Sequence, residues 1–367
     1  MLECYTTTMD IIVNIIVSIL TAYLALTNSL ATGVQYMIDS FVETEESAEM
    51  PAETLESIPS FASSIPDILL RSNEYQQAAL VGATAGLSES GTNDPLSSIV
   101  NIFCTFTTEH SIRTTTGTGF FIDSDGIIMT NAHIAQFLLL EKTDAFGDAK
   151  CTVRIGSPAV ARYEAELLYI SPTWVQENAA LIDDAAPMGT GERDYALLYI
   201  SGDVEAWPLP ARFPALPFDS DLLPTSVREA KVIAAGYPAK DLIEQGSAAA
   251  LRGRTAATTI SELYTFGSNY ADVFSVRGSD VGAQGSSGGP IVNESGAVIG
   301  MIATRGDDEV DGVGSLRAIT LSHINRSMKE ESGFTLEENL GGDLAFRAKV
   351  FADTMSPFLL SILEGEQ

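Results

Sequence analysis

Twelve short β-rich segments follow Pro95, and they constrain the fold of this chain more than any other feature. Turn signals separate them, and short strands of this kind close into barrels or pack as sandwiches. The predicted strands are Ile99–Phe106, Gly119–Ile122, Ile127–Thr130, Cys151–Ile155, Glu166–Ile170, Tyr195–Ile200, Lys231–Ala235, Thr255–Leu263, Val273–Val276, Pro290–Val292, Val298–Ala303 and Leu316–Thr320. A hydrophobic content of 45% in 367 residues allows a sizeable core. We therefore expect an all-β domain.

One hexapeptide in this region, residues 285–290, has the sequence Gly-Ser-Ser-Gly-Gly-Pro. A nucleophilic serine needs an exposed hydroxyl on a tight turn and backbone N–H groups aimed at the developing negative charge. Glycine allows both the sharp bend and the close approach of the backbone. A Ser/Gly surface turn would have the same composition, so partners elsewhere must decide. Ser287 is the candidate nucleophile, and Ser286 is expected to point away.

A histidine suited to activate that serine follows a predicted hairpin. The strands Gly119–Ile122 and Ile127–Thr130 are joined by a turn that contains Asp-Gly, which is a strong hairpin signal. The second strand and a short helical turn deliver His133 to the end of a buried strand, where an imidazole can be held rigidly. The other histidines, His110 and His323, lie in a polar stretch and at the start of a C-terminal helix. We expect both to be structural or surface residues.

A carboxylate that could orient the imidazole stands where an apolar strand begins. Residues 193–200 are Arg-Asp-Tyr-Ala-Leu-Leu-Tyr-Ile, which places Asp194 at the mouth of a buried strand. A carboxylate there loses hydration energy unless it is paired, and pairing with His133 would supply the partner. Asp183 and Asp184 are the alternatives, but they lie in a polar loop that contains Ala and Pro. The sequence therefore favours Asp194.

Together these residues resemble the chymotrypsin-like serine peptidases, and the Deg/HtrA type in particular. The family has the order His, Asp, Ser along the chain, as here. Three motifs carry the resemblance: Gly117–His133, Asp194–Leu197 and Gly285–Pro290. Ser286 departs from the family, which usually has Asn or Asp there. The likeness covers residues 95–329.

The resemblance implies a fold and an activity. It implies two six-stranded antiparallel β-barrels, with His133 and Asp194 from the first and Ser287 from the second. The activity would be serine endopeptidase cleavage of proteins or peptides through an acyl-enzyme. Ser287 would attack the carbonyl, His133 would transfer the proton and Asp194 would orient His133. The N–H groups of Gly285 and Ser287 would form the oxyanion hole.

Substrate selection can also be assigned by resemblance. The residue six before the nucleophile lies at the base of the pocket for the substrate side chain, and here it is Val281. A valine cannot pair with Arg or Lys, so we expect cleavage after small or medium aliphatic residues. A shift of one position would place Asp280 there instead. The segment Ile302–Arg305, with Ile302, Ala303 and Thr304 as substrate-binding residues, would form one pocket wall and pair with substrate backbone.

Other functions fit the sequence less well. The same fold could bind peptides without catalysis, although inactive relatives usually lose the histidine or the serine. The same triad could also cleave esters, but the α/β-hydrolase order Ser, Asp, His is absent. A net charge of −29 argues against nucleic acid as a partner. The three scattered histidines and the lack of Cys-x-x-Cys indicate no metal, and no cofactor is expected.

The N-terminus has a different character. No charge occurs between Asp10 and Asp39, and about twenty apolar residues can span a bilayer. A transmembrane signal anchor through residues 11–30 and a cleaved signal peptide ending near 29–31 are both compatible with this run. We expect an anchor, with the catalytic domain outside the cytoplasm, and a secreted protein as the alternative.

Four regions follow from these observations. They are a membrane anchor or signal segment at 1–38, an acidic, proline-containing linker at 39–94, the peptidase domain at 95–330 and a C-terminal helical extension at 331–367. A helix is expected at Ser72–Leu87 and another at Asp343–Ile362, interrupted by Pro357. The extension is too short for a PDZ domain. Cys104 and Cys151 form either a disulfide or two buried thiols, and the odd count leaves Cys4 over.

Overall fold

The computed structural model describes residues 56–57, 92–107, 112–143, 147–183, 191–240 and 250–365. All of them belong to one unit of the chain, Met50–Gln367. The expected membrane segment at 1–38, the expected helix at Ser72–Leu87, and His110 lie outside the described residues. Within the ranges given above, no helix is long and apolar enough to cross a membrane.

The first six strands after Pro95 close into an antiparallel barrel with the order β2-β3-β4-β7-β6-β5. Its strands are β2 (Ile99–Thr107), β3 (Ile112–Asp123), β4 (Ile127–Thr130), β5 (Asp148–Ile155), β6 (Val160–Ile170) and β7 (Ala196–Asp203). The predicted hairpin joins β3 to β4, and Asp123 Oδ1 accepts the N–H of Asp125 at 2.8 Å in its turn. Every residue of β4 is buried, as its run of apolar side chains predicts.

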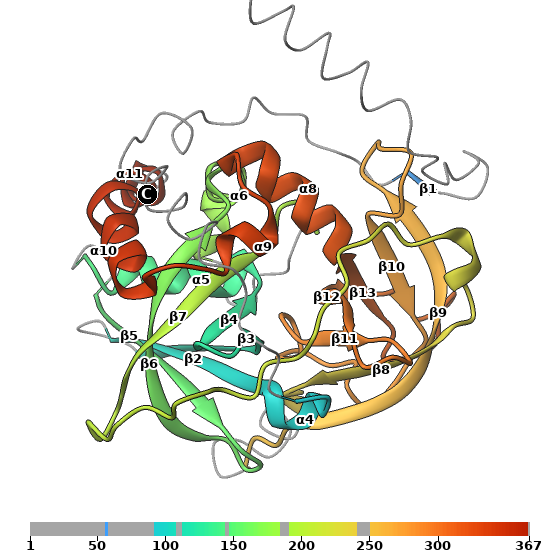
Figure 1. Cartoon of the computed structure of the whole chain (residues 1–367), viewed down its shortest axis with the longest axis horizontal. Coiled ribbons are helices and arrows are strands. Elements are labelled where there is room, and N and C mark those ends of the chain that lie inside the picture. Colours follow the sequence, from blue (N-terminus) through green and yellow to red (C-terminus); the bar gives the residue numbers. More distant parts are fainter. Residues whose placement is uncertain are drawn as a thin grey trace, which may run out of the picture. The chain divides into compact units, whose positions relative to one another are not determined.

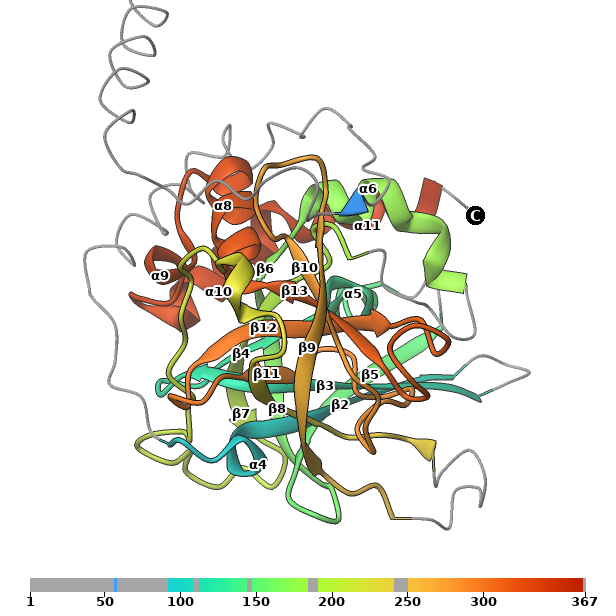
Figure 2. The same cartoon turned by 90° about the vertical axis from the view of Figure 1, so that its right-hand side faces the viewer.

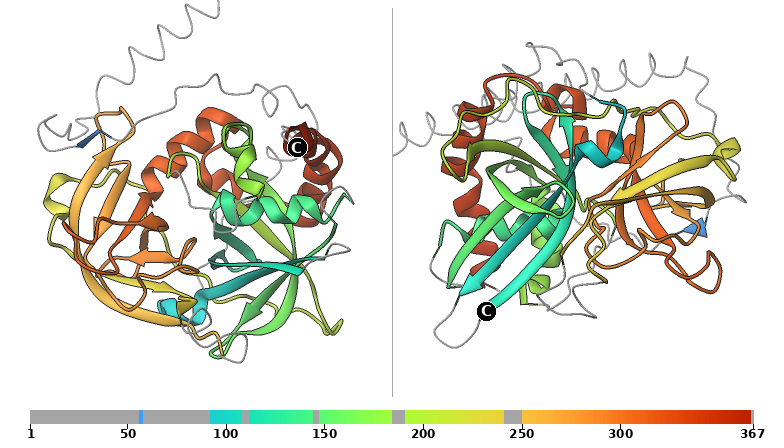
Figure 3. Two further views of the ribbon diagram at one scale, coloured as in Figure 1. Left: turned by 180° about the vertical axis from the view of Figure 1, so that it is seen from behind. Right: turned by 90° about the horizontal axis from the view of Figure 1, so that it is seen from below.

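The next six strands form a second antiparallel barrel with the order β9-β10-β13-β12-β11-β8, which pairing of β8 with β9 closes. Its strands are β8 (Lys231–Gly236), β9 (Arg254–Thr265), β10 (Val273–Val276), β11 (Pro290–Val292), β12 (Val298–Arg305) and β13 (Leu316–Thr320). A two-residue strand, β1 (Glu56–Ser57), pairs with β9 in parallel. Figures 1 and 3 show the two barrels side by side, and Figure 2 shows the long β9 in front. The expected pair of six-stranded barrels is confirmed.

All twelve predicted strands are present, and several extend beyond their predicted limits. β3 begins at Ile112 rather than at Gly119, because its threonine-rich first half still pairs with β2. Likewise β6 begins at Val160 rather than at Glu166. In both extensions most side chains are exposed or half-buried. The runs of apolar residues therefore predicted the buried part of these two strands but not their more polar first halves.

Helices cover the barrels, and the C-terminal ones follow the sequence signals. The helices are α4 (Pro95–Ser98), α5 (Ala132–Leu140), α6 (Pro172–Asn178), α8 (Leu321–Ser332), α9 (Leu336–Asn339), α10 (Leu344–Thr354) and α11 (Ser356–Gly365), with 3-10 turns at Ala179–Asp183 and Thr225–Val227. Thr320 caps α8 by accepting the N–H of His323 at 3.1 Å. The expected helix at Asp343–Ile362 is two helices, since Pro357 stands at the second position of α11 and cannot continue α10.

The C-terminal helix α8 connects the two barrels. It packs against β12 and β13 of the second barrel, and its C-terminal half reaches α6 and the end of β6 (Figure 1). In the first barrel, Cys104 on β2 and Cys151 on β5 are direct cross-strand neighbours and form a disulfide. Of the two possibilities left open for these cysteines, the structure has the bonded one. Cys4 lies outside the described residues.

Candidate active site

His133 is the second residue of α5, which starts directly after β4. The predicted short helical turn is a nine-residue helix, because the residues that follow His133 are almost all apolar and buried. The imidazole is 1% exposed. Asn131, which precedes the helix, donates from Nδ2 to the carbonyl oxygen of Asp194 at 2.9 Å. The start of α5 is therefore tied to the segment that enters β7.

Asp194 lies directly before β7 and is completely buried. Its Oδ1 accepts the main-chain N–H of His133 at 2.9 Å, and its Oδ2 lies 2.7 Å from Nδ1 of the imidazole. One carboxylate thus holds both the backbone and the ring of His133. Because an ionised carboxylate only accepts, Nδ1 carries the hydrogen and Nε2 is left as an acceptor. The pairing expected for Asp194 is present, whereas the neighbouring residues 184–190 lie outside the described ranges.

The serine-containing turn has the backbone that its glycines predict. Gly285 has φ +96° and Gly288 has φ +84°, both in the left-handed region. Ser286 is buried and its hydroxyl donates to the carbonyl oxygen of Val281 at 2.5 Å. Ser287 is half-buried, and its hydroxyl donates to the carbonyl oxygen of Ala303 at 3.5 Å. As expected, Ser286 points away from the surface and Ser287 is the accessible serine.

This turn lies against the first barrel. Thr118 on β3 donates its N–H to the carbonyl oxygen of Ser287 at 2.8 Å and its hydroxyl to that of Gly285 at 2.7 Å. Gly288 comes so close that an added Cβ would lie 1.9 Å from the Thr118 oxygen and 2.6 Å from Oγ1 of Thr130. Because Thr130 stands three residues before His133, these contacts join the serine turn to the strand ends that carry the histidine.

Two details of this site matter for chemistry. Among the described residues, the hydrogen bond of the Ser287 hydroxyl runs to Ala303 rather than to His133. The backbone N–H groups of Gly285 and Ser287 have no acceptor within the described part of the chain. Both groups are therefore available as donors to a ligand oxygen.

The predicted substrate-binding residues lie close to this turn. Val281 is completely buried in the core of the second barrel. Ile302 is also buried, and its N–H and C=O are bonded to the backbone of Gly289 and Gly288 at 2.8 Å each. A register shift between Ile302 and Thr304 leaves Ala303 without a partner on β13. Of the three strand residues, Thr304 is the half-buried one.

Sequence reasoning missed Thr118 and Glu331. Thr118 stands between two glycines, directly before the predicted strand Gly119–Ile122, and its hydroxyl also accepts the N–H of Tyr237 at 2.9 Å. The run Gly117-Thr118-Gly119 could have indicated this role, because glycine in a strand often marks a place where another backbone comes close. Glu331 is 1% exposed and contacts the segment around Asp194. An acidic residue in a polar helix gave no signal at all.

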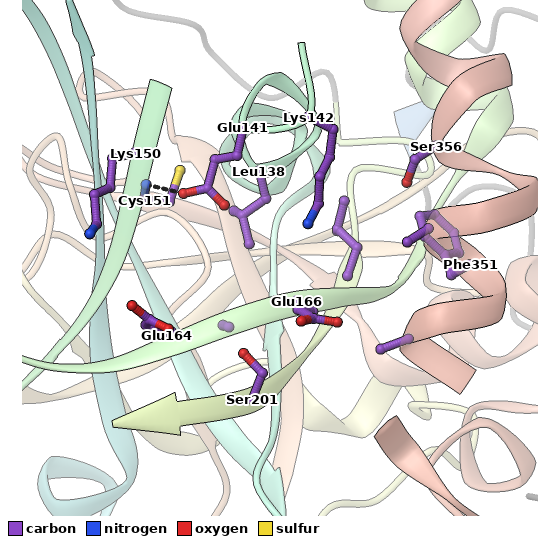
Figure 4. Close-up of a pocket in the computed structure, with 14 residues that line it drawn as sticks. Leu138, Glu141, Lys142, Lys150, Cys151, Glu164, Glu166, Ser201, Phe351 and Ser356 are labelled. Carbon is purple, nitrogen blue, oxygen red and sulfur yellow. Dashed lines mark hydrogen bonds between the residues drawn. The ribbon is translucent and has the colours of Figure 1, made fainter. Parts of the chain in front are cut away.

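A separate cavity of about 290 Å³ is lined by β5, β6 and β7 of the first barrel, by α10 and by Ser356 at the start of α11. Charged residues of both signs line it, from the turn after α5 and from β5 and β6 (Figure 4). Glu141 is the most constrained of them, since it accepts the N–H of Cys151 at 2.5 Å and burial raises its pKa. None of the predicted site residues lines this cavity. In the part of the chain that the structure describes, no cluster of His, Cys, Asp and Glu could hold a metal ion.

One comparison with known proteins identifies the family of this chain. No curated protein matches the chain. Among solved structures, a crystal structure of a serine-to-alanine mutant of Rv3671c from M. tuberculosis H37Rv, in its inactive form, is 20% identical. The match covers 68% of this chain and 97% of that chain, with a TM-score of 0.38. A family model described as a trypsin-like peptidase domain matches residues 117–301, a range that includes His133, Asp194 and Ser287. Because that range is just over half of the 367 residues, the chain belongs to the family of trypsin-like peptidase domains.

Proposed function

We propose that the protein is a serine endopeptidase in which His133, Asp194 and Ser287 form the catalytic triad. The observation that carries the proposal is the buried pair of Asp194 and His133, with contacts of 2.9 and 2.7 Å to the backbone and the ring. A carboxylate held this way fixes the tautomer and stabilises the imidazolium that forms during catalysis. Protein or peptide substrates follow from the peptidase family.

The chemistry begins with a movement of the Ser287 hydroxyl. Its weak 3.5 Å contact to Ala303 is readily exchanged for a hydrogen bond to Nε2 of His133, because catalytic hydrogen bonds often tighten only when substrate binds. His133 then takes the proton as Ser287 attacks the carbonyl, and an acyl-enzyme forms as the amine leaves with that proton. Water then attacks the acyl-enzyme while His133 takes a proton from it, and His133 returns that proton to the Ser287 oxygen as the acid product leaves.

The negative oxygen of the intermediate is stabilised by the N–H groups of Gly285 and Ser287. Neither N–H has an acceptor among the described residues, and the positive φ of Gly285 turns the backbone at this point. Thr118 supports the turn by binding the carbonyl oxygen of Gly285, which keeps that oxygen out of the hole. Removing one such donor typically costs about 3 kcal/mol in the barrier.

Substrate would pair with the strand after Ile302. Among the described residues, β11 pairs with β12 only as far as Met301, and Gly288 and Gly289 bond to the backbone of Ile302. The side of Ala303 and Thr304 that faces away from β13 is therefore the part of β12 that an added strand can use. We propose cleavage after small or medium aliphatic residues, since the residue assigned to the base of the pocket, Val281, is apolar, and Asp280 beside it is exposed. A peptide-library profile dominated by Arg or Lys would contradict this assignment.

We propose that the catalytic domain works in an oxidising compartment outside the cytoplasm, either tethered by the apolar segment at 11–30 or secreted. The disulfide between Cys104 and Cys151 supports this, because such bonds persist mainly in oxidising compartments. Fractionation of cells into membrane, soluble and external fractions tests it. Recovery of the intact protein in the cytosol with both thiols free would rule it out.

The activity is tested by covalent labelling with a fluorophosphonate probe. We expect labelling of the wild type, labelling of Ser286→Ala, and none of Ser287→Ala, because only Ser287 is the nucleophile. Incubation with unfolded casein, with cut sites read by mass spectrometry, then separates a peptidase from an esterase. A folded wild type that stays unlabelled would indicate a peptide-binding protein without catalysis.

A further inference from the structure

A buried carboxylate that the proposed mechanism does not use lies behind Asp194. Glu331 is on the last turn of α8 and is 1% exposed, whereas Glu330 beside it is exposed. A buried charge is strongly unfavourable unless other groups pair with it or donate hydrogen bonds to it. The partners of Glu331 therefore indicate what this carboxylate does.

Those partners lie where β6 ends and where β7 begins. Oε1 of Glu331 accepts the hydroxyl of Ser171 at 2.9 Å, and Oε2 accepts the hydroxyl of Tyr169. The hydroxyl of Tyr195 lies 3.4 Å from Oε2 and also donates to Ser327 of α8 at 2.8 Å. Tyr169 and Tyr195 are stacked, with ring centroids 6.0 Å apart. These contacts tie α8 to the ends of β6 and β7.

Glu331 also contacts the residue before Asp194. Nε of Arg193 lies 3.7 Å from Oε1 of Glu331. Arg193 has φ +55°, a left-handed conformation that costs a non-glycine residue about 1 kcal/mol or more. The N–H of Tyr195 donates to the carbonyl oxygen of Arg193 at 2.8 Å, which makes a tight turn around Asp194. A strained turn of this kind persists only where its surroundings hold it.

We propose that Glu331 is a positioning residue of the active site: by binding Tyr195 and Arg193, which flank Asp194, it holds the Asp194 carboxylate where it orients His133. The inference rests on the proposed triad and extends the site to the C-terminal helix. Burial raises the pKa of Glu331, and the hydrogen bond from Tyr169 opposes that rise.

The first test is Glu331→Gln, with Glu330→Gln as the matched control. Glutamine keeps the shape and one acceptor oxygen, but an amide nitrogen in place of Oε2 cannot accept the hydroxyl of Tyr169, and the uncharged amide loses the attraction to Arg193. We expect kcat to fall at least about tenfold, since small displacements of a catalytic group reduce rates this much. KM should stay within about twofold, because β12 is untouched. Titration of the active sites with the fluorophosphonate gives the concentration of reactive enzyme, and kcat is calculated per reactive site, so misfolded protein does not lower it.

A second readout does not depend on turnover. The hydrogen between Nδ1 of His133 and the carboxylate of Asp194 should give a far-downfield proton NMR signal in the wild type, because the contact is only 2.7 Å long. We expect Glu331→Gln to shift or broaden this signal and Glu330→Gln to leave it unchanged. A residue that only stabilised the fold would lower the melting temperature without moving the signal.

Tyr195→Phe provides a variant that keeps the buried ring and removes only the hydroxyl. If Glu331 acts through Tyr195, the double variant should lose no more kcat than Glu331→Gln alone. Additive losses, or a folded Glu331→Gln with the kcat and NMR signal of the wild type, would overturn the inference. Failure of the triad itself would be seen separately, as a wild type that the fluorophosphonate does not label.

Discussion

At the scale of single residues, the site depends on two contacts of one carboxylate. Asp194 accepts the backbone N–H of His133 at 2.9 Å and faces Nδ1 at 2.7 Å. The first contact holds the start of α5, and the second sets which ring nitrogen carries hydrogen. Both contacts need an acceptor at position 194. An amide of the same shape is therefore not equivalent to the carboxylate.

We expect Asp194→Asn to lower kcat at neutral pH by about 10³- to 10⁴-fold, because an amide that donates to Nδ1 stabilises the wrong tautomer of His133. The control is Asp203→Asn, which removes another buried carboxylate of β7, paired with Arg162 at 2.9 Å. Asp203→Asn should lose stability and keep kcat. Equal kcat values for the two variants, measured with a fluorogenic peptide, would contradict the role of Asp194.

Gly288 makes a second prediction at this scale. An alanine there meets both a φ of +84° and a Cβ only 1.9 Å from the Thr118 oxygen. We expect Gly288→Ala to reduce the free energy of unfolding by more than about 3 kcal/mol and to abolish labelling of Ser287. Gly267 is the control, because it also has a positive φ, +102°, but nothing lies within 4 Å of a Cβ added there. Gly267→Ala should cost only about 1–2 kcal/mol and retain labelling. Similar urea midpoints for the two variants would argue against the close approach of the barrels.

At the scale of elements, α8 is held at both ends by buried carboxylates. Glu331 binds its C-terminal end to the first barrel. In its N-terminal half, Arg326 donates from Nη2 to Oδ1 of Asp272 at 2.6 Å, and Nδ1 of His323 lies 3.2 Å from the same oxygen. Asp272 belongs to the second barrel and directly precedes β10. His323 is therefore a structural residue of this helix. A helix anchored twice in this way can transmit the position of one barrel to the other.

The anchor at Asp272 makes stability depend on pH. Burial favours its neutral form, but hydrogen bonds from His323, Ser268 and the N–H of Phe266 outweigh burial and lower its pKa from 3.8 to about 2. Its contribution is present above the unfolded pKa and is lost as pH falls through the folded pKa. A shift of this size corresponds to about 2 kcal/mol.

We therefore expect Asp272→Asn to lose about 2 kcal/mol at pH 7 and the difference from wild type to shrink as pH falls from about 4 toward 2. Urea unfolding at a series of pH values measures this. Asp353→Asn is the control, because Asp353 is exposed and its ion pair with Lys349 should contribute little. A difference that stays constant down to pH 2 would refute the anchor.

At the scale of the whole molecule, charge of one sign dominates. The chain has 49 Asp and Glu residues and 20 Lys and Arg residues, which gives a net charge of −29. Repulsion among like charges destabilises a compact chain while it keeps the protein soluble. Because salt shortens the range of this repulsion, from about 30 Å at 0.01 M to about 3 Å at 1 M, stability should depend on ionic strength.

We expect the urea midpoint of unfolding to rise when NaCl is increased from about 0.01 to 0.5 M, with most of the gain at the low end, where screening changes most. KCl at the same ionic strength should give the same gain, whereas an equal osmolarity of sucrose should not reproduce this early rise. A midpoint that falls with salt would mean that specific ion pairs outweigh the overall repulsion.

Much of this architecture could be predicted from local sequence. Apolar runs bounded by turn residues placed all twelve strands, and four of them, such as Ile127–Thr130 and Val273–Val276, have the predicted limits. The motifs around His133 and Ser287 indicated the family, which the family model confirms, and supplied two candidate site residues. The expected membrane segment and linker lie outside the described residues and stay predictions.

What the sequence determined by itself was thus the twelve strands of the barrels and the candidate site residues, because hydrophobic periodicity and glycine-dependent turns act within a few residues of the chain. The tertiary structure alone decided which distant groups meet. The sequence separation of Glu331 from Tyr195 is 136, and its chemistry is that of any surface glutamate in a helix. Only the packing of α8 across both barrels buries it behind Asp194, since burial is a property of the folded surface and not of the residue.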